Sequence, residues 1–167
     1  MLQEGAIDFG VISTPIQRRM DFKFRKVRDI QDIFVAGKKF AYLADRKLSY
    51  KDLETLPVMC LEGNTSTRAY VEGFLRENSV HLQPEFELAT SDMLIRFAMR
   101  GFGIAGVAED FALEAMEKGE IFRLHFDREI PKRHFCIVTD EKVPMTAAAR
   151  RFLNLLEDKC THDKHKT

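Results

Sequence analysis

The sequence predicts an α/β fold, and two patterns indicate it. Apolar runs of strand length alternate with longer segments whose apolar residues recur every three or four positions, as on one face of a helix. Twice, at residues 56–68 and 84–94, an apolar run ends in a cluster of hydroxyl residues that leads into a helical pattern. We expect this alternation to form a mostly parallel sheet with helices on its faces.

Length and composition narrow the class of protein. The 167 residues are 45% apolar and include 14 Phe, enough to build one sizeable α/β domain or two small lobes. The 26 basic and 26 acidic residues balance, so the chain has no overall electrostatic attraction to nucleic acid or acidic lipid. No apolar run approaches the roughly 20 residues that span a bilayer, and residues 1–5 lack the character of a signal peptide. We therefore expect a cytoplasmic protein.

The first third of the chain is predicted to be rich in strands, at residues 6–12, 22–30 and 32–36. Gly5 is typical of the residue that follows a helix end, so the first strand is expected to follow a helix. Residues 22–30 alternate apolar and polar side chains, the pattern of a half-buried strand. Residues 48–53 then predict a short helix with Ser49 as its cap.

The rest of the chain continues the alternation of strands and helices. After the strand that ends before Gly63, we expect helices at residues 67–78, 92–100, 110–118 and 147–158, with strands at 86–89, 104–107, 121–126 and 134–139. Gly119 is predicted to follow the end of the third of these helices, and Thr146 to cap the fourth.

Residues 101–106, GFGIAG, match the glycine pattern of a dinucleotide-binding loop. That motif requires a strand before it and a helix that begins within it. Here a predicted helix ends at Gly101 and a strand follows, which is the reverse order. We therefore expect the glycines to end the helix and to permit close packing of the backbone.

No catalytic or metal-binding constellation emerges from the remaining polar residues. His162 and His165 have a spacing found in metal sites, but they lie in a charged tail without a cysteine cluster. The three cysteines, Cys60, Cys136 and Cys160, are widely separated and are expected to be buried thiols. We assign no catalytic residue, metal or cofactor.

Acidic residues form two further candidate groups. The pairs Glu85 with Glu87 and Asp110 with Glu114 fit solvated faces of a strand and a helix. Asp8 and Asp92 lie at element boundaries, and Asp92 is most simply a charge in the first turn of a helix.

Hydroxyl residues gather where two predicted strands give way to helices. They are Thr65, Ser66, Thr67, Thr90 and Ser91. Helix capping explains one hydroxyl in each loop. Ligands in open α/β sheets bind outside the carboxyl ends of the strands, where these residues fall, and the N–H groups of a helix start attract anions. Capping and ligand binding therefore remain open as alternatives for each loop.

Several segments, taken in order, resemble the effector-binding domain of LysR-type transcriptional regulators. The matching segments are LQEGAIDFGVI (2–12), LSYKDL (48–53), GNTSTR (63–68), FELATSD (86–92), RGFGIAGV (100–107) and TAAARRFLNLL (146–156). Each is short, but their shared order and spacing extend from residue 2 to residue 156.

The resemblance implies two Rossmann-like lobes of the type 2 periplasmic-binding-protein kind, with the first lobe incomplete. Residues 1–40 and 140–167 would form part of lobe I, and residues 41–139 would form lobe II. A small, often anionic metabolite would bind between the lobes, with hinge segments at residues 36–40 and 139–142. The implied ligand contacts are Ser13, Thr14, Thr65, Ser66, Thr90, Ser91 and Val107.

The chain also departs from the family pattern. The winged helix-turn-helix, the linker helix and the first strand, helix and second strand of lobe I have no counterpart in this sequence, so DNA contact is expected only through a domain that this chain lacks. The proline that often ends the strand at residues 104–107 is replaced by Ala108-Glu109. An incomplete lobe leaves sheet edges exposed, and we expect self-association. The alternatives are an enzyme or a solute receptor on the same two-lobe fold.

Overall fold

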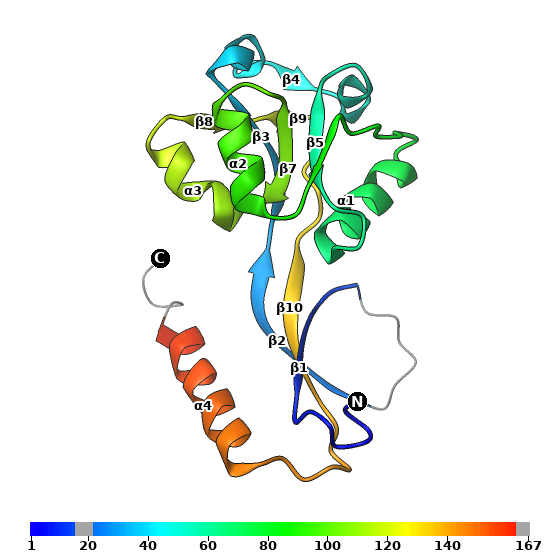
Figure 1. Cartoon of the computed structure of the whole chain (residues 1–167), viewed down its shortest axis with the longest axis vertical. Coiled ribbons are helices and arrows are strands. Elements are labelled where there is room, and N and C mark those ends of the chain that lie inside the picture. Colours follow the sequence, from blue (N-terminus) through cyan, green and yellow to red (C-terminus); the bar gives the residue numbers. More distant parts are fainter. Residues whose placement is uncertain (16–21, 163–167) are drawn as a thin grey trace. The chain divides into compact units, whose positions relative to one another are not determined.

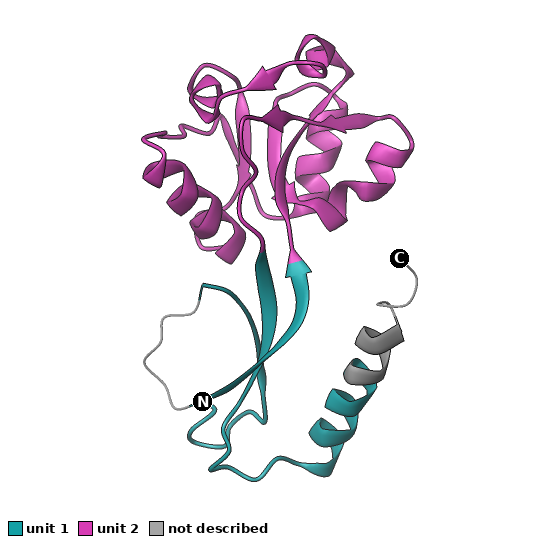
Figure 2. Cartoon of the chain, turned by 180° about the vertical axis from the view of Figure 1, so that it is seen from behind, with its two compact units in different colours: residues 1–29, 133–167 teal, residues 30–132 magenta. Residues whose placement is uncertain are grey.

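A computed structural model describes residues 1–15 and 22–162, with side chains up to residue 156. The chain divides into two compact units (Figure 2). Unit 1 comprises residues 1–29 and 133–167, and unit 2 comprises residues 30–132. The hinges predicted at residues 36–40 and 139–142 describe a motion, which one structure does not test, so they stay a prediction. The predicted lobe boundaries also stay a prediction.

Unit 1 contains a three-stranded sheet in the order β1 (Gly10–Ser13), β10 (Arg133–Thr139), β2 (Lys23–Ile30), with β1 antiparallel to β10. Helix α4 (Ala147–His162) belongs to the same unit, and its Phe152 stacks on Phe9 at 5.7 Å between ring centroids. Thr146 caps α4 as predicted, since its hydroxyl accepts from the Ala149 N–H at 3.3 Å. Both carboxylate oxygens of Asp8 bind Thr146, so Asp8 is a structural residue.

Unit 2 is built on a five-stranded sheet in the order β6 (Phe86–Leu88), β5 (Val58–Leu61), β7 (Ile104–Ala108), β3 (Asp32–Gly37), β8 (Ile121–Arg123) (Figure 1). Strand β5 runs parallel to β6 and β7, which confirms the predicted repeat of strand and helix. Strand β3 is antiparallel to both β7 and β8, so the sheet is mixed: β5, β6, β7 and β8 run in one direction, as the prediction of a mostly parallel sheet requires, and β3 runs against them. The strand that precedes β3 along the chain, β2, belongs to the sheet of unit 1.

Helices cover both faces of this sheet and form two hydrophobic cores. On one face, α1 (Ser66–Glu77) and the 3₁₀ helices η1 (Lys38–Leu43) and η2 (Tyr50–Glu54) bury residues such as Leu43, Tyr50 and Phe74. On the other, α2 (Ser91–Met99) and α3 (Glu109–Glu117) bury Leu94 and Ala112. The short parallel pair β4 (Lys47–Leu48) and β9 (His125–Phe126) completes the unit.

The helices predicted at residues 48–53, 67–78, 92–100 and 110–118 are present, with ends displaced by a residue or two at most, and α4 extends farther than predicted. Residues 2–5, which were predicted to end a helix, form a turn, and the strand predicted at residues 6–12 is confined to Gly10–Ser13. Ser49 caps η2 through a capping box with Asp52, as expected for residues 48–53. The predicted strand at residues 121–126 is divided into β8 and β9, and η1 was not predicted. The described residues contain no helix of the length and apolar character that crossing a membrane requires.

The glycines of the GFGIAG segment act in packing. Gly101 follows α2 with φ of 73°, a conformation that favours glycine. A Cβ atom at Gly103 would lie 2.5 Å from the Pro57 carbonyl oxygen, too close for any other residue without a shift of the backbone. Because a helix precedes these glycines and a strand follows them, the segment lacks the arrangement of a dinucleotide-binding loop.

Candidate ligand-binding site

Strands β5, β6 and β7 are parallel, so their carboxyl ends lie together at one end of the unit 2 sheet. This line of strand ends is called the edge of the sheet below. Helix α1 begins after β5 and helix α2 after β6, so the two helix starts lie at this edge. The Glu62 N–H donates to the Leu88 carbonyl at 3.1 Å and ties the loop after β5 to the end of β6. The edge therefore brings the two predicted hydroxyl loops together.

The two threonines of these loops are helix caps. The Thr65 hydroxyl accepts from the Arg68 N–H at 3.2 Å and donates to the Glu62 carbonyl at 3.0 Å. The Thr90 hydroxyl accepts from the Met93 N–H at 3.3 Å. The Thr65 hydroxyl thus both donates and accepts a hydrogen bond within the fold, whereas the Thr90 hydroxyl accepts one and can still donate its proton to a ligand.

The serine that follows each cap is differently placed. Ser66 and Ser91 are the first residues of α1 and α2, and within the described residues neither hydroxyl forms a hydrogen bond. Ser66 is exposed, whereas Ser91 is only 9% exposed. The N–H groups of the first helical residues have no intrahelical acceptor. Each loop therefore offers a hydroxyl and backbone donors to a ligand.

Arg68, which the sequence analysis did not single out, organises this edge. Its guanidinium donates to the Leu61 carbonyl at 2.9 Å and forms ion pairs with Glu72 at 2.6 Å and Glu87 at 3.1 Å. Burial acts to lower the pKa of Arg68, but the hydrogen bond and charge of Glu72 and the charge of Glu87 outweigh it and raise the pKa. The positive charge of Arg68 is thus already matched by carboxylates.

Of the two ion pairs of Arg68, only one can be predicted from the sequence. The Arg68–Glu72 pair follows from their separation by four residues on a helix. The contact with Glu87 depends on the pairing of β5 with β6, which the local sequence does not specify.

The remaining predicted contacts differ in accessibility. Val107 is fully buried and lies opposite Ile33 in the sheet, so only its backbone is available to a ligand. In unit 1, Ser13 ends β1 and is half-buried. The Thr14 hydroxyl accepts from the His134 N–H at 2.9 Å and so holds β1 to β10.

Other reactive groups do not gather at this edge in the described part of the chain. No group of three or more His, Cys, Asp or Glu side chains there is arranged to hold a metal ion. Cys60 and Cys136 are buried free thiols, as predicted, and burial raises the pKa of Cys60 to about 11. Burial likewise raises the pKa of Tyr50, in the core, to about 12. The side chains of Cys160, His162 and His165 lie outside the described residues.

Solved structures share this fold at low sequence identity. The regulatory domain of CcmR from Synechocystis PCC6803, solved in complex with 2-PG, is 17% identical, with a TM-score of 0.79 over 93% of this chain and 74% of that one. The bromide-bound regulatory domain of HypT from Salmonella typhimurium is 17% identical, with a TM-score of 0.76 over 97% and 76%. The effector-binding domain of QuiR in complex with shikimate is 10% identical, with a TM-score of 0.77 over 98% and 76%.

Comparison with curated protein sequences finds no match. The model of the LysR substrate binding domain, by contrast, matches residues 1–161, nearly the whole chain. The chain belongs to the LysR substrate-binding domain family, the effector-binding domains of LysR-type transcriptional regulators.

Proposed function

We propose that this chain senses a small, singly charged, hydroxylated anion, and that the anion binds at the edge of unit 2 where α1 and α2 begin. The observation that carries this proposal is the pair of unengaged serine hydroxyls, Ser66 and Ser91, at neighbouring helix starts. Backbone N–H groups and the helix dipole favour an anionic group at such a position. Thr65, Thr90 and the Val107 backbone complete the proposed set of contacts in unit 2, and Ser13 and Thr14 stay predicted contacts of unit 1.

The charges near this edge favour a ligand with low charge. Glu62 is in the loop after β5, Glu87 on β6, and Asp92 in the first turn of α2, whereas Arg68 is already paired. A ligand with several negative charges would be repelled by these carboxylates. A ligand with one carboxylate and several hydroxyls avoids that repulsion and uses the serines. Neighbours with the same fold are solved with small ligands, namely 2-PG in CcmR, bromide in HypT and shikimate in QuiR, which supports a small ligand here.

We further propose that binding involves no chemical reaction and that the chain acts in the cytoplasm as part of a longer, oligomeric regulator. DNA contact would come from a helix-turn-helix domain of that regulator. The thiol nearest the site, Cys60, is buried, and its raised pKa keeps it protonated at neutral pH. The family consists of regulatory domains, which is consistent with this role.

A thermal-shift screen tests the proposal. We expect at least one hydroxylated monocarboxylate to raise the melting temperature in proportion to the logarithm of its concentration. Ser66→Ala and Ser91→Ala should each weaken binding by about 10- to 100-fold, because each removes a hydrogen bond to a charged group worth roughly 1.5–3 kcal/mol. Thr55→Ala is the matched control, since Thr55 lies before the opposite end of β5 and its hydroxyl, among the described residues, bonds only to the Asp52 carbonyl. A stabiliser whose affinity is equal in the serine variants and the control would contradict this site.

A further inference from the structure

Residues 127–132 connect β9 to β10 without forming a helix or a strand, and they end where unit 2 gives way to unit 1 (Figure 2). We call this segment the strap. Its side chains are exposed except for that of Ile130, which is 3% exposed and belongs to the hydrophobic core under α1. A segment without the hydrogen bonds of a helix or strand opens readily unless other contacts hold it.

Side chains of unit 2 hold the backbone of the strap. Three of its carbonyl groups accept hydrogen bonds from three separate parts of the unit: Arg128 from the Tyr50 hydroxyl of η2 at 2.9 Å, Ile130 from the Gln31 amide between β2 and β3 at 2.8 Å, and Pro131 from the Tyr70 hydroxyl of α1 at 2.9 Å. Of the three donors, only Tyr70 lies on a helix that begins at the proposed ligand site. These contacts can break without the loss of any hydrogen bond between strands of the sheet.

Helix α1 joins the strap to the proposed ligand site. Ser66, Tyr70 and Phe74 follow one another at intervals of four residues, so they lie along one side of the helix. Ser66 is at the helix start, the Tyr70 hydroxyl bonds to the strap, and the centroid of the Phe74 ring lies 5.5 Å from the Arg128 Cζ atom. In an α-helix the N–H of each residue bonds to the carbonyl four residues before it, so the position of Tyr70 depends on the first turn.

We propose that Tyr70 is a positioning residue that links the ligand site to the strap. A negative charge at the start of α1 stabilises the first helical turn. The first turn positions Tyr70, whose hydroxyl holds the Pro131 carbonyl, so an anion at the helix start keeps the strap held for more of the time. Without the anion, the strap is released more often at the point where the chain leaves unit 2. This inference rests on the proposed function for the place of the anion.

Limited trypsin digestion of the full chain measures release of the strap. Trypsin cleaves after Arg128 and Lys132, and cleavage follows the population of the open state when opening is fast. Tyr70→Phe removes only the hydroxyl, and we expect cleavage at these two sites to become about three- to tenfold faster because one hydrogen bond is lost. Tyr42→Phe is the matched control and should change nothing, since Tyr42 is 61% exposed and its hydroxyl has no hydrogen bond among the described residues.

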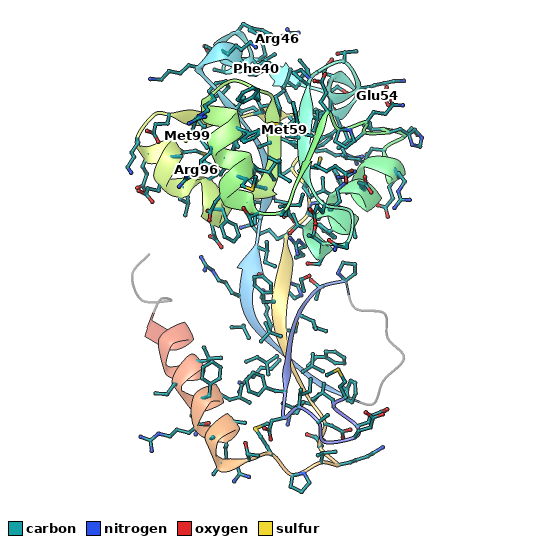
Figure 3. The ribbon with its side chains drawn as sticks, in the orientation of Figure 1. Phe40, Arg46, Glu54, Met59, Arg96 and Met99 are labelled. Atoms are coloured by element: carbon teal, nitrogen blue, oxygen red, sulfur yellow. The ribbon has the colours of Figure 1, made fainter. Side chains whose placement is uncertain are left out.

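Cleavage after Arg96 distinguishes release of the strap from a loss of stability in the whole unit. Arg96 lies within α2, on the opposite face of the sheet from α1 (Figure 3). Cleavage there requires α2 to unfold, so its rate should be the same in Tyr70→Phe and in the original chain. A purely structural role of Tyr70 would raise the rates at Arg96 and in the strap by the same factor.

Ser66→Asp tests the link without any ligand, because its carboxylate supplies a negative charge at the start of α1. We expect cleavage of the strap to be about two- to fivefold slower than in the original chain, and not to slow when Ser66→Asp is combined with Tyr70→Phe. Gln83→Glu is the control, since it makes the same change in charge at an exposed position outside α1. It should leave the rate unchanged.

The proposal is overturned if Tyr70→Phe leaves cleavage of the strap unchanged, if it speeds cleavage after Arg96 equally, or if Ser66→Asp acts equally with Tyr70 and with Phe at that position. None of these results depends on finding a ligand. A ligand found in the thermal-shift screen would therefore stand even if the link fails, and the link between the helix start and the strap would stand even if the screen finds no ligand.

Discussion

At the scale of single residues, Arg68 has the largest structural role at the proposed site. Its side chain is 7% exposed and holds the Leu61 carbonyl together with two carboxylates. We expect Arg68→Met to lower the free energy of unfolding by roughly 1–3 kcal/mol, because the carbonyl loses a charged donor and the carboxylates lose their partner. Urea denaturation measures this change. Arg76→Met, on the exposed side of the same helix, should stay within about 0.5 kcal/mol of the original chain. Equal losses in both variants would refute the role of Arg68.

The sequence predicted which hydroxyl residues lie at the site, but not which of them cap helices and which stay available to a ligand. Thr65, Ser66, Thr90 and Ser91 were candidates both for capping and for ligand binding, and the structure assigns capping to the threonines. Which hydroxyl caps depends on the residue at which the helix begins, and α1 begins one residue earlier than predicted. A shift of one residue changes the hydrogen-bonding role of every side chain in the first turn.

At the scale of elements, close contact between β3 and α2 depends on Gly37. A Cβ atom there would lie 2.1 Å from the Ala98 carbonyl oxygen, which is backbone and cannot rotate away. We expect Gly37→Ala to destabilise the chain by about 1–3 kcal/mol, the usual range for overpacking. Gly73→Ala is the matched control, since nothing lies within 4 Å of its Cβ position inside α1. Alanine there should stabilise the helix by about 0.5–1 kcal/mol. Thermal denaturation that shows the same sign for both changes would refute this difference.

The elements themselves were largely predictable, whereas their directions were only partly so. The helical spacing of Val71, Phe74 and Leu75 gave α1, because this spacing is a local property that burial of one helix face requires. The direction of β3 had no such signal. Its six residues are all buried and carry no alternation, so the sequence does not say which neighbours they pair with. Pairing with β7 and β8 is decided by tertiary structure.

At the scale of the whole molecule, the two units differ in how much apolar surface they bury within themselves. Within the described residues, the two large hydrophobic clusters, one under α1 and one under α2 and α3, lie in unit 2. In unit 1, by contrast, Val11 is 56% exposed and Phe135 is 40% exposed on adjoining strands. Burial of apolar area is the main source of stability, so the units should differ in their ability to fold alone.

Excision of unit 2 tests this difference. Residues 30–132 form one continuous segment that retains all five strands of its sheet and the helices on both faces. We expect this fragment to unfold in urea in a single cooperative transition, because domains of about 100 residues with their own core usually behave as two-state systems. Tyrosine fluorescence, to which Tyr50 in the core contributes, and circular dichroism of the helices should give the same midpoint.

Residues 1–29 mixed with residues 133–167 should show no cooperative transition, since they supply a three-stranded sheet with exposed apolar residues and one helix. A gradual, non-cooperative unfolding of the 30–132 fragment would mean that the stability of unit 2 depends on unit 1.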